Sequence, residues 1–195
     1  LAAPDATQPT LGGDNTPVDR TADSTGVYLW DVTGLTFTSG SVTISCALPR
    51  VQTGVWISAE ADEGTYDGSR DYGTGDFNVT VGALADFVFS GSGSELEGIA
   101  FGSGYDVTAV DQYQNVLTSF ASTVTLSASG TGTPDISGLS GAGGDEIAGG
   151  SFSSGVATLD NVVLTNTAGD ASGSYDINAN SAAINSATDL SVTVT

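Results

Sequence analysis

Short apolar runs of alternating polarity recur along the chain, separated by clusters of Gly, Ser, Asn and Pro. Leu190, Val192 and Val194 share one parity near the C-terminal end, and Val124 and Leu126 do so in the sequence STVTLSA. Alternation at period 2 with frequent turns is typical of an antiparallel β-sandwich. The 3.6-residue apolar period of a helix is absent, so the pattern predicts an all-β protein.

The same alternation assigns a core to the second half of the chain. Residues of one parity are expected to face inward, and the Ser, Thr and Asp residues between them to face water. The inward set predicted in this way is Val107, Val124, Leu126, Tyr175, Ile177, Val192 and Val194.

Changes in amino-acid composition along the sequence divide the chain into three parts. Residues 1–25 are polar and contain three prolines, which predicts an extended N-terminal arm. Residues 26–82 contain apolar runs such as VYLWDV and GVWISAEA, which predict an N-terminal β-rich module. Residues 83–195 are predicted to form a second β-sandwich. A single larger sandwich is the alternative to these two modules.

The sequence YDVTAVDQYQNVLTSFASTVTLS carries the pattern of a known family. Val110, Asp111, Tyr113 and Asn115 match a strand that ends in V-D-x-Y-G-N, and the later VTLS matches the strand that follows it. Through these motifs, residues 84–195 resemble the Ig-like domains of bacterial and archaeal surface proteins of the invasin and intimin type. The resemblance implies an Ig-like sandwich and a location on a microbial surface, but it specifies no ligand.

The match departs from the family pattern at Gln114, where the family has Gly. A residue with a side chain adopts positive φ less readily than Gly does, so the turn is expected to differ there. Asp111 and Asn115 are expected to cap this turn rather than to bind a metal ion. The first 80 residues carry no family pattern.

The formal net charge is −20, from 23 acidic residues against three arginines. Binding to phosphate groups relies on Lys and Arg, so this composition argues against nucleic acid and anionic membranes as partners. Repulsion among the carboxylates destabilises a compact fold, and salt screens it, because the Debye length falls to about 3 Å at 1 M. The composition predicts a halophilic source and stability that rises with ionic strength. We also expect the source to be archaeal. An acidic surface protein from an ordinary environment is the alternative.

Residue types for catalysis are few. The chain has no His, which excludes Ser-His-Asp and Cys-His arrangements. Cys46 is the single cysteine and has the alternation of a buried strand residue, so we expect a structural role and no intrachain disulfide. The acidic residues are spread along turns, as on a solvated surface. We therefore expect no enzymatic activity and no cofactor, with calcium as the one candidate ion.

The chain has no run of 18 apolar residues and does not begin with Met. The first observation argues against insertion in a membrane. The second leads us to expect an exported, extracellular protein from which a signal has been removed.

An acidic, Gly-rich loop is the candidate calcium site, because Ca²⁺ prefers oxygen ligands. It lacks the ligand spacing of an EF-hand, and a flexible solvated loop is the favoured alternative. The candidate ligands are Asp62, Glu63, Asp67, Asp71 and Asp76.

Two further features suggest contacts with sugars. Asn78 begins the sequon Asn-Val-Thr, and alternation places it opposite the apolar face of its strand, which makes it the candidate N-glycosylation site. Four aromatic residues are candidates for a sugar-binding platform, although Trp at alternating positions is more often part of a core. They are Trp30, Trp56, Tyr66 and Tyr72.

An unusually apolar segment follows the N-terminal arm. It is predicted either to be a core strand of its own module or to insert into the sheet of a neighbouring subunit by β-strand addition. Its candidate subunit contacts are Val27, Leu29, Trp30, Val32, Leu35 and Phe37.

These observations favour an extracellular structural protein that self-associates into a homopolymer. We expect a repeating subunit of a microbial filament, resembling a pilus, or of a surface layer, and a glycoprotein if Asn78 is modified. An adhesin or carbohydrate-binding module and a virion spike or fibre are the alternatives that the sequence leaves open.

Overall fold

The computed structural model describes residues 10–11, 38–41, 46–48, 51–55, 58–59, 72–73, 77–130, 132–166, 172–182 and 184–195. It divides into two compact units, unit 1 (Leu1–Thr80) and unit 2 (Val81–Thr195). Nearly all of the regular structure is β, which confirms the predicted all-β class. The one helical element in the described part is a 3-10 turn, η1 (Gly149–Ser151).

Unit 1 has three antiparallel strand pairs among its described residues. They are β1 (Thr10–Leu11) with β2 (Cys46–Ala47), β3 (Gln52–Val55) with β6 (Phe77–Val79), and β4 (Ser58–Ala59) with β5 (Tyr72–Gly73). Thr38 and Ser41 pair across a turn in which Ser39 and Gly40 both have positive φ, as in a two-residue hairpin turn. Strand β1 lies within residues 1–25, so part of the predicted arm is paired.

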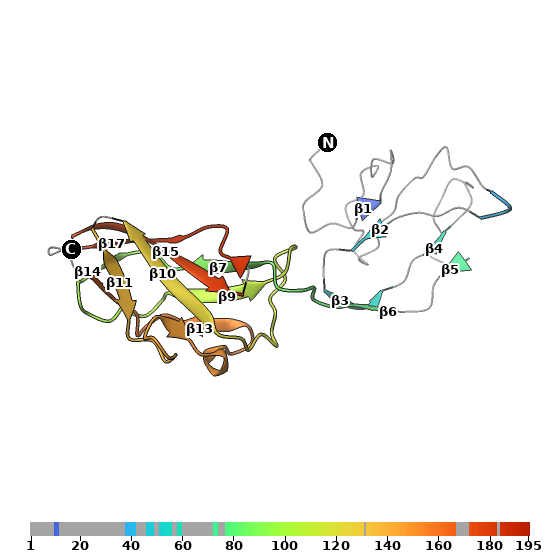
Figure 1. The fold of residues 1–195 in the computed structure, drawn as a ribbon. Coiled ribbons are helices and arrows are strands. Elements are labelled where there is room, and N and C mark those ends of the chain that lie inside the picture. Colours follow the sequence, from blue (N-terminus) through green and yellow to red (C-terminus); the bar gives the residue numbers. More distant parts are fainter. Residues whose placement is uncertain are drawn as a thin grey trace. The chain divides into compact units, whose positions relative to one another are not determined.

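Unit 2 is a β-sandwich (Figure 1). Its larger sheet has the order β12-β10-β15-β17-β8, and β16 also pairs with β15. These strands are β8 (Ser94–Glu95), β10 (Val124–Gly130), β12 (Glu146–Ile147), β15 (Gly173–Ser181), β16 (Ile184–Asn185) and β17 (Leu190–Val194). The other sheet has the order β13-β9-β7, formed by β7 (Asp86–Ser90), β9 (Asp106–Val110) and β13 (Val156–Thr158). Strands β11 (Pro134–Ser137) and β14 (Val163–Asn166) form a further antiparallel pair.

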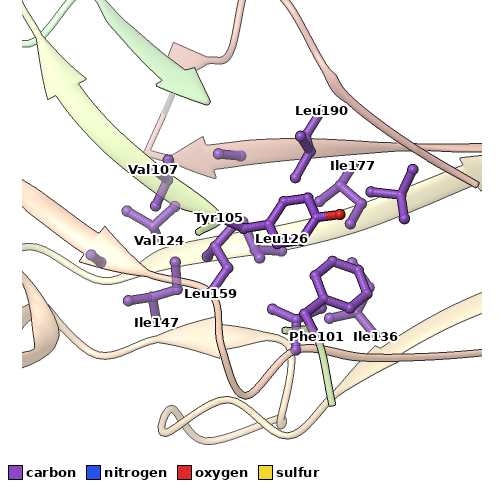
Figure 2. Close-up of a cluster of buried hydrophobic side chains, with 14 of the residues drawn as sticks. Phe101, Tyr105, Val107, Val124, Leu126, Ile136, Ile147, Leu159, Ile177 and Leu190 are labelled. Atoms are coloured by element: carbon purple, nitrogen blue, oxygen red, sulfur yellow. The ribbon is translucent and has the colours of Figure 1, made fainter. Parts of the chain in front are cut away.

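The core of unit 2 confirms the inward set predicted from alternation. All seven residues are between 0% and 1% exposed: Val107, Val124, Leu126, Tyr175, Ile177, Val192 and Val194. Alternation did not identify other members, among them Phe101, Tyr105 and Leu159, which lie on irregular segments (Figure 2). Burying a side chain of this size contributes about 1.5–3 kcal/mol, so this cluster is the main source of stability in unit 2.

The chain changes sheets between β7 and β8. Strand β7 is antiparallel to β9, whereas β8 is parallel to β17. Gly91 begins the connection with a φ of +99°, and a Cβ there would lie 2.5 Å from the carbonyl oxygen of Gly104. A side chain therefore does not fit at this position, and Gly is required for the crossing.

The strand directions place two segments at opposite ends of unit 2. Residues 81–85 precede β7, whose first residue, Asp86, pairs with Val110. Strand β17 begins near that end, since the Ala187 amide donates to Asp86 Oδ1 at 2.8 Å. Its last residue, Val194, pairs with Glu95 in β8 at the other end.

Candidate functional site

Asp111 is the most heavily hydrogen-bonded carboxylate in the described part of unit 2. It follows β9 and is 2% exposed. Its Oδ1 accepts the backbone N–H groups of Tyr113 at 2.8 Å and Asn115 at 3.0 Å, and the Asn115 side-chain amide donates to both oxygens. This confirms that Asp111 and Asn115 cap their own turn. We call residues 111–115 the Asp111 turn.

The Asp111 turn also holds the first residues of unit 2. The Gly82 N–H donates to Asp111 Oδ2 at 2.9 Å, and the Ala85 N–H donates to the Val110 carbonyl at 2.9 Å. Both bonds join the segment that leads into β7 to the end of β9. The carboxylate is therefore a tie between two backbone segments 29 residues apart.

Two opposing effects set the pKa of Asp111. Burial raises it, because desolvation disfavours the charged form. The hydrogen bonds from Gly82, Asn115 and Tyr113 stabilise the carboxylate and together outweigh the burial effect, so the pKa lies below its ordinary value. The folded protein therefore stabilises the ionised form of the Asp111 side chain.

Gln114 has a left-handed backbone conformation, with a φ of +65°, although a residue with a side chain adopts positive φ less readily than Gly. The surrounding bonds explain this, because Asp111 accepts from residues on both sides of Gln114, whose own N–H donates to the Asp111 carbonyl at 2.9 Å. A left-handed conformation costs a residue with a Cβ about 1–2 kcal/mol, which these bonds offset. That this turn differs from the turn of the family pattern stays a prediction.

Tyr105 presents the opposite situation to Asp111. Its side chain is 4% exposed, and its hydroxyl has no hydrogen-bond partner among the residues that the structure describes. Burial raises the pKa of Tyr105, and the nearby Glu95 carboxylate raises it further. No hydrogen bond joins the Tyr105 hydroxyl to Glu95 in the described structure, so the negative charge of Glu95 accounts for its effect on this pKa.

A groove of about 540 Å³ lies between β7 and the start of β17. Its wall includes Phe87, Phe89 and Leu190, and its polar rim includes Asp86 and Asp189. Asp86 Oδ1 accepts the N–H groups of Phe87 and Ala187, and Asp189 Oδ1 accepts the Asn178 side-chain amide at 2.9 Å. Both carboxylates therefore tie strands or loops together at the rim of this groove.

Several predicted site residues lie outside the described part of the chain. These are the candidate calcium ligands Asp62, Glu63, Asp67, Asp71 and Asp76, and the candidate subunit contacts Val27, Leu29, Trp30, Val32, Leu35 and Phe37. Trp30, Trp56 and Tyr66 of the aromatic platform lie outside it too, whereas Tyr72 lies on β5. Within the described residues, no group of three or more His, Cys, Asp or Glu side chains is arranged to hold a metal ion.

Asn78 is described, and its side chain is exposed on β6. Val79 beside it is half-buried, and Thr80, which completes the sequon, is exposed. The asparagine thus lies on the face that alternation predicted, although its glycosylation stays a prediction.

Sequence reasoning did not identify the groove, the Gly82–Asp111 tie or the buried Tyr105 hydroxyl, which has no partner in the described part of the chain. Each depends on residues far apart in the chain, and none has a local signal comparable to the V-D-x-Y pattern.

No family model, curated protein or solved structure matches this chain. The structure contains no helix among its described residues that is long and apolar enough to cross a membrane.

Proposed function

We propose that this protein is an exported structural protein of a microbial surface, a repeating subunit of an extracellular filament or surface layer. The proposal rests on the structural role of the Asp111 carboxylate, which is buried and accepts hydrogen bonds from the backbone. Its oxygens bind the backbone at Gly82, Tyr113 and Asn115, so the best-defined polar site in unit 2 strengthens the fold at the segment where the chain enters it.

The arrangement of strands in unit 2 supports an Ig-like type for this module. One sheet has the order β13-β9-β7 and the other β12-β10-β15-β17-β8. The first two strands, β7 and β8, belong to different sheets, and β8 pairs in parallel with the last strand. Two packed sheets whose strands are antiparallel apart from the β8–β17 pair are compatible with an Ig-like domain, a type that recurs in surface proteins of many kinds. Fold alone does not assign function, so the proposal needs a direct test.

Assembly by β-strand donation is part of the proposal. Strand β8 pairs with β17 only at Thr193 and Val194, so the β8 side of Leu190–Val192 has no described partner strand. This edge borders the groove between β7 and β17. An extended segment from another subunit would add main-chain hydrogen bonds along such an edge. The apolar segment 26–38 is the proposed donor, because a freely exposed apolar run of this kind would aggregate and pairing with a neighbouring sheet would cover it.

Electron microscopy of the full chain in negative stain tests the proposed function. Filaments or ordered sheets are expected at high protein concentration in molar KCl. Isolated particles under all salt conditions would contradict it and favour the adhesin or carbohydrate-binding alternative. Deleting residues 1–38 tests strand donation, since assembly should be lost and restored by a synthetic peptide of residues 26–38.

The saline environment, calcium binding and Asn78 glycosylation remain parts of this proposal. A melting temperature that rises between dilute buffer and molar KCl would support the first, because salt screens repulsion among uncompensated carboxylates. Calcium titration monitored by calorimetry tests the acidic loop, and mass spectrometry of the natural protein tests the sequon.

A further inference from the structure

The groove between β7 and the start of β17 has a strand edge on each side. Strand β7 is the last strand of the sheet β13-β9-β7, and the β8 side of β17 is paired only at Thr193 and Val194. The two strands run in the same direction, because the bond from Ala187 to Asp86 joins their first ends and β7 leads on to β8, which pairs with the end of β17. An extended segment that enters the groove therefore meets both edges.

The hydrogen bonds of β9 show which backbone groups of β7 face the groove. The Ala109 N–H donates to the Gly155 carbonyl, and the Ala109 carbonyl accepts from the Leu117 N–H, so Ala109 uses neither group on Phe87, the residue opposite it in β7. Bonded pairs alternate along antiparallel strands. The backbone groups of Phe87 and Phe89 therefore point away from β9, and both residues line the groove.

The same alternation applies to β17. The Thr195 N–H donates to the Glu95 carbonyl at 3.0 Å, so the backbone groups of Thr193 and Ser191 face the same side of the strand. Ser191 lines the groove and has no strand opposite it on this side among the described residues. The groove thus offers main-chain donors and acceptors from two strands, which is what β-strand addition requires.

Two carboxylates, Asp86 and Asp189, lie at the end of the groove where β17 begins. Each uses its Oδ1 atom to accept hydrogen bonds within the fold, and neither Oδ2 atom accepts a bond from the described residues. The sequence of unit 2 contains no compensating charge, because residues 81–195 include twelve acidic residues and no Lys or Arg. The free oxygens are therefore able to bind a cationic group of a partner.

We infer that the groove binds an extended segment of a different protein, which places apolar residues along the groove and an Arg or Lys beside Asp86 and Asp189. The apolar residues lie against the wall that includes Phe89 and Leu190, and the main chain pairs with the two strand edges. A guanidinium or ammonium group makes charge-assisted hydrogen bonds to the free carboxylate oxygens. The groove volume of about 540 Å³ suits a segment of a few residues.

Charge complementarity is the reason for assigning the partner to a different protein. Unit 2 of a second copy has no base to offer, and segment 26–38, the donor in the proposed function, has Asp31 as its one charged residue. A segment of a basic protein matches the two carboxylates, whereas these segments do not. The inference goes beyond the proposed function. In a head-to-tail polymer, the groove of one terminal subunit receives no donor, and a basic protein bound there can anchor or cap the polymer.

The peptide acetyl-Arg-Val-Thr-Val-Arg-amide is the probe, added to the full-length chain in moderate salt. Arg at both ends puts a positive charge beside the carboxylates whether the peptide runs parallel or antiparallel to β17. Calorimetric titration should show binding at least about tenfold tighter than for the same peptide with Glu at both ends. Replacing both Val residues by Ser tests the apolar wall, and N-methylation of their amides tests main-chain pairing. Each change should weaken binding by about tenfold.

The double variant Asp86→Asn and Asp189→Asn locates the binding site. Each Asn keeps an oxygen that accepts the hydrogen bonds within the fold, so the melting temperature should stay near that of the original chain while the affinity for the Arg peptide falls by about tenfold. The matched control is Asp135→Asn with Asp160→Asn, which removes the same charge from exposed positions outside the groove and should bind the peptide normally. The comparison of Arg and Glu peptides on the original chain decides the question if the groove variant unfolds.

The outcomes separate this inference from the proposed function. Equal binding of the Arg and Glu peptides, or equal losses in the two double variants, would overturn the inference, because net charge alone would then explain the binding. If a peptide of residues 26–38 binds and the Arg peptide does not, the inference fails and strand donation between copies stands. Selective binding of the Arg peptide to a chain that forms no filaments supports the inference and contradicts the proposed function.

Discussion

Two buried side chains that carry oxygen atoms in unit 2 differ in their hydrogen bonding. The Asp111 carboxylate, 2% exposed, accepts hydrogen bonds from Gly82, Tyr113 and Asn115. The Tyr105 hydroxyl is 4% exposed and has no described partner. The charged group, which is the more expensive of the two to bury, is thus the one that is fully compensated.

The difference shows what each residue contributes to the protein. Asp111 holds the start of unit 2 in place through its hydrogen bond from Gly82. The bonds to Asp111 also stabilise a turn in which Gln114 has a strained, positive φ. Tyr105 contributes apolar area, since its ring packs against Phe101 with centroids 5.2 Å apart. We therefore expect the hydroxyl of Tyr105 to be dispensable and the carboxylate of Asp111 to be essential for stability.

The largest effect is expected from Gly91→Ala, at the crossing beside Tyr105. A Cβ would lie 2.5 Å from the Gly104 carbonyl oxygen and 2.9 Å from Tyr105 Cδ1. We expect the free energy of unfolding to fall by about 3 kcal/mol or more, because both the positive φ and the clash oppose the change. Chemical denaturation of the full chain measures it. Gly104→Ala, with positive φ but nothing within 4 Å of the new Cβ, is the control and should cost less.

Asp111→Asn should lower the free energy of unfolding by about 2–3 kcal/mol, since bonds from a charged group are lost. An amide nitrogen in place of one oxygen cannot accept the Gly82 N–H. The exposed Asp135→Asn removes the same charge from β11 and serves as the control, for which we expect little change. Equal losses in both variants would show that net charge, and not the tie to Gly82, governs the result.

Lowering the pH should reduce the free energy of unfolding of the original protein more than that of the Asp111→Asn variant. The pKa of Asp111 is lower in the folded state than its ordinary value of 3.8. Its ionised form therefore contributes stability above that value, and the contribution is lost as the pH falls towards the folded pKa. Urea midpoints measured downward from pH 6 should converge for the two proteins in molar KCl. A constant gap between them would contradict the assigned pKa direction.

Gln114→Gly should stabilise unit 2 by about 1 kcal/mol. Relief of the left-handed strain outweighs the greater backbone entropy of Gly in the unfolded chain. Gln114→Ala keeps the strain and removes the amide, so it is expected to stay near the original value. A loss of stability in both variants would indicate that the Gln114 side chain, which borders the groove, makes a stabilising contact.

Tyr105→Phe should leave stability unchanged or raise it by up to about 1 kcal/mol, because the buried hydroxyl has no hydrogen-bond partner among the described residues. The thermal midpoint of the full chain is a sufficient measurement. A clear loss would instead reveal a hydrogen bond to Glu95. The companion variant Glu95→Gln keeps the shape of that side chain and separates its charge from its bonding.

The sequence by itself determined the β class and much of the core of unit 2. Alternation at period 2 is a local property of each strand, so Val107, Ile177 and Val192 were assigned to the interior correctly. The turn-forming chemistry of Asp and Asn likewise predicted that Asp111 and Asn115 cap their own turn, because a side chain that caps its own turn needs only nearby residues.

Tertiary structure decided the features that depend on distant segments. The Gly82–Asp111 bond joins residues 29 apart, and the Ala187–Asp86 bond joins residues 101 apart. Gln114 shows the same principle within a single turn. Its intrinsic preference argued against positive φ, but the hydrogen bonds around it were worth more than the strain. Intrinsic preferences and periodicity can be read locally, whereas the balance between strain and compensating bonds exists only once the strands have been brought together.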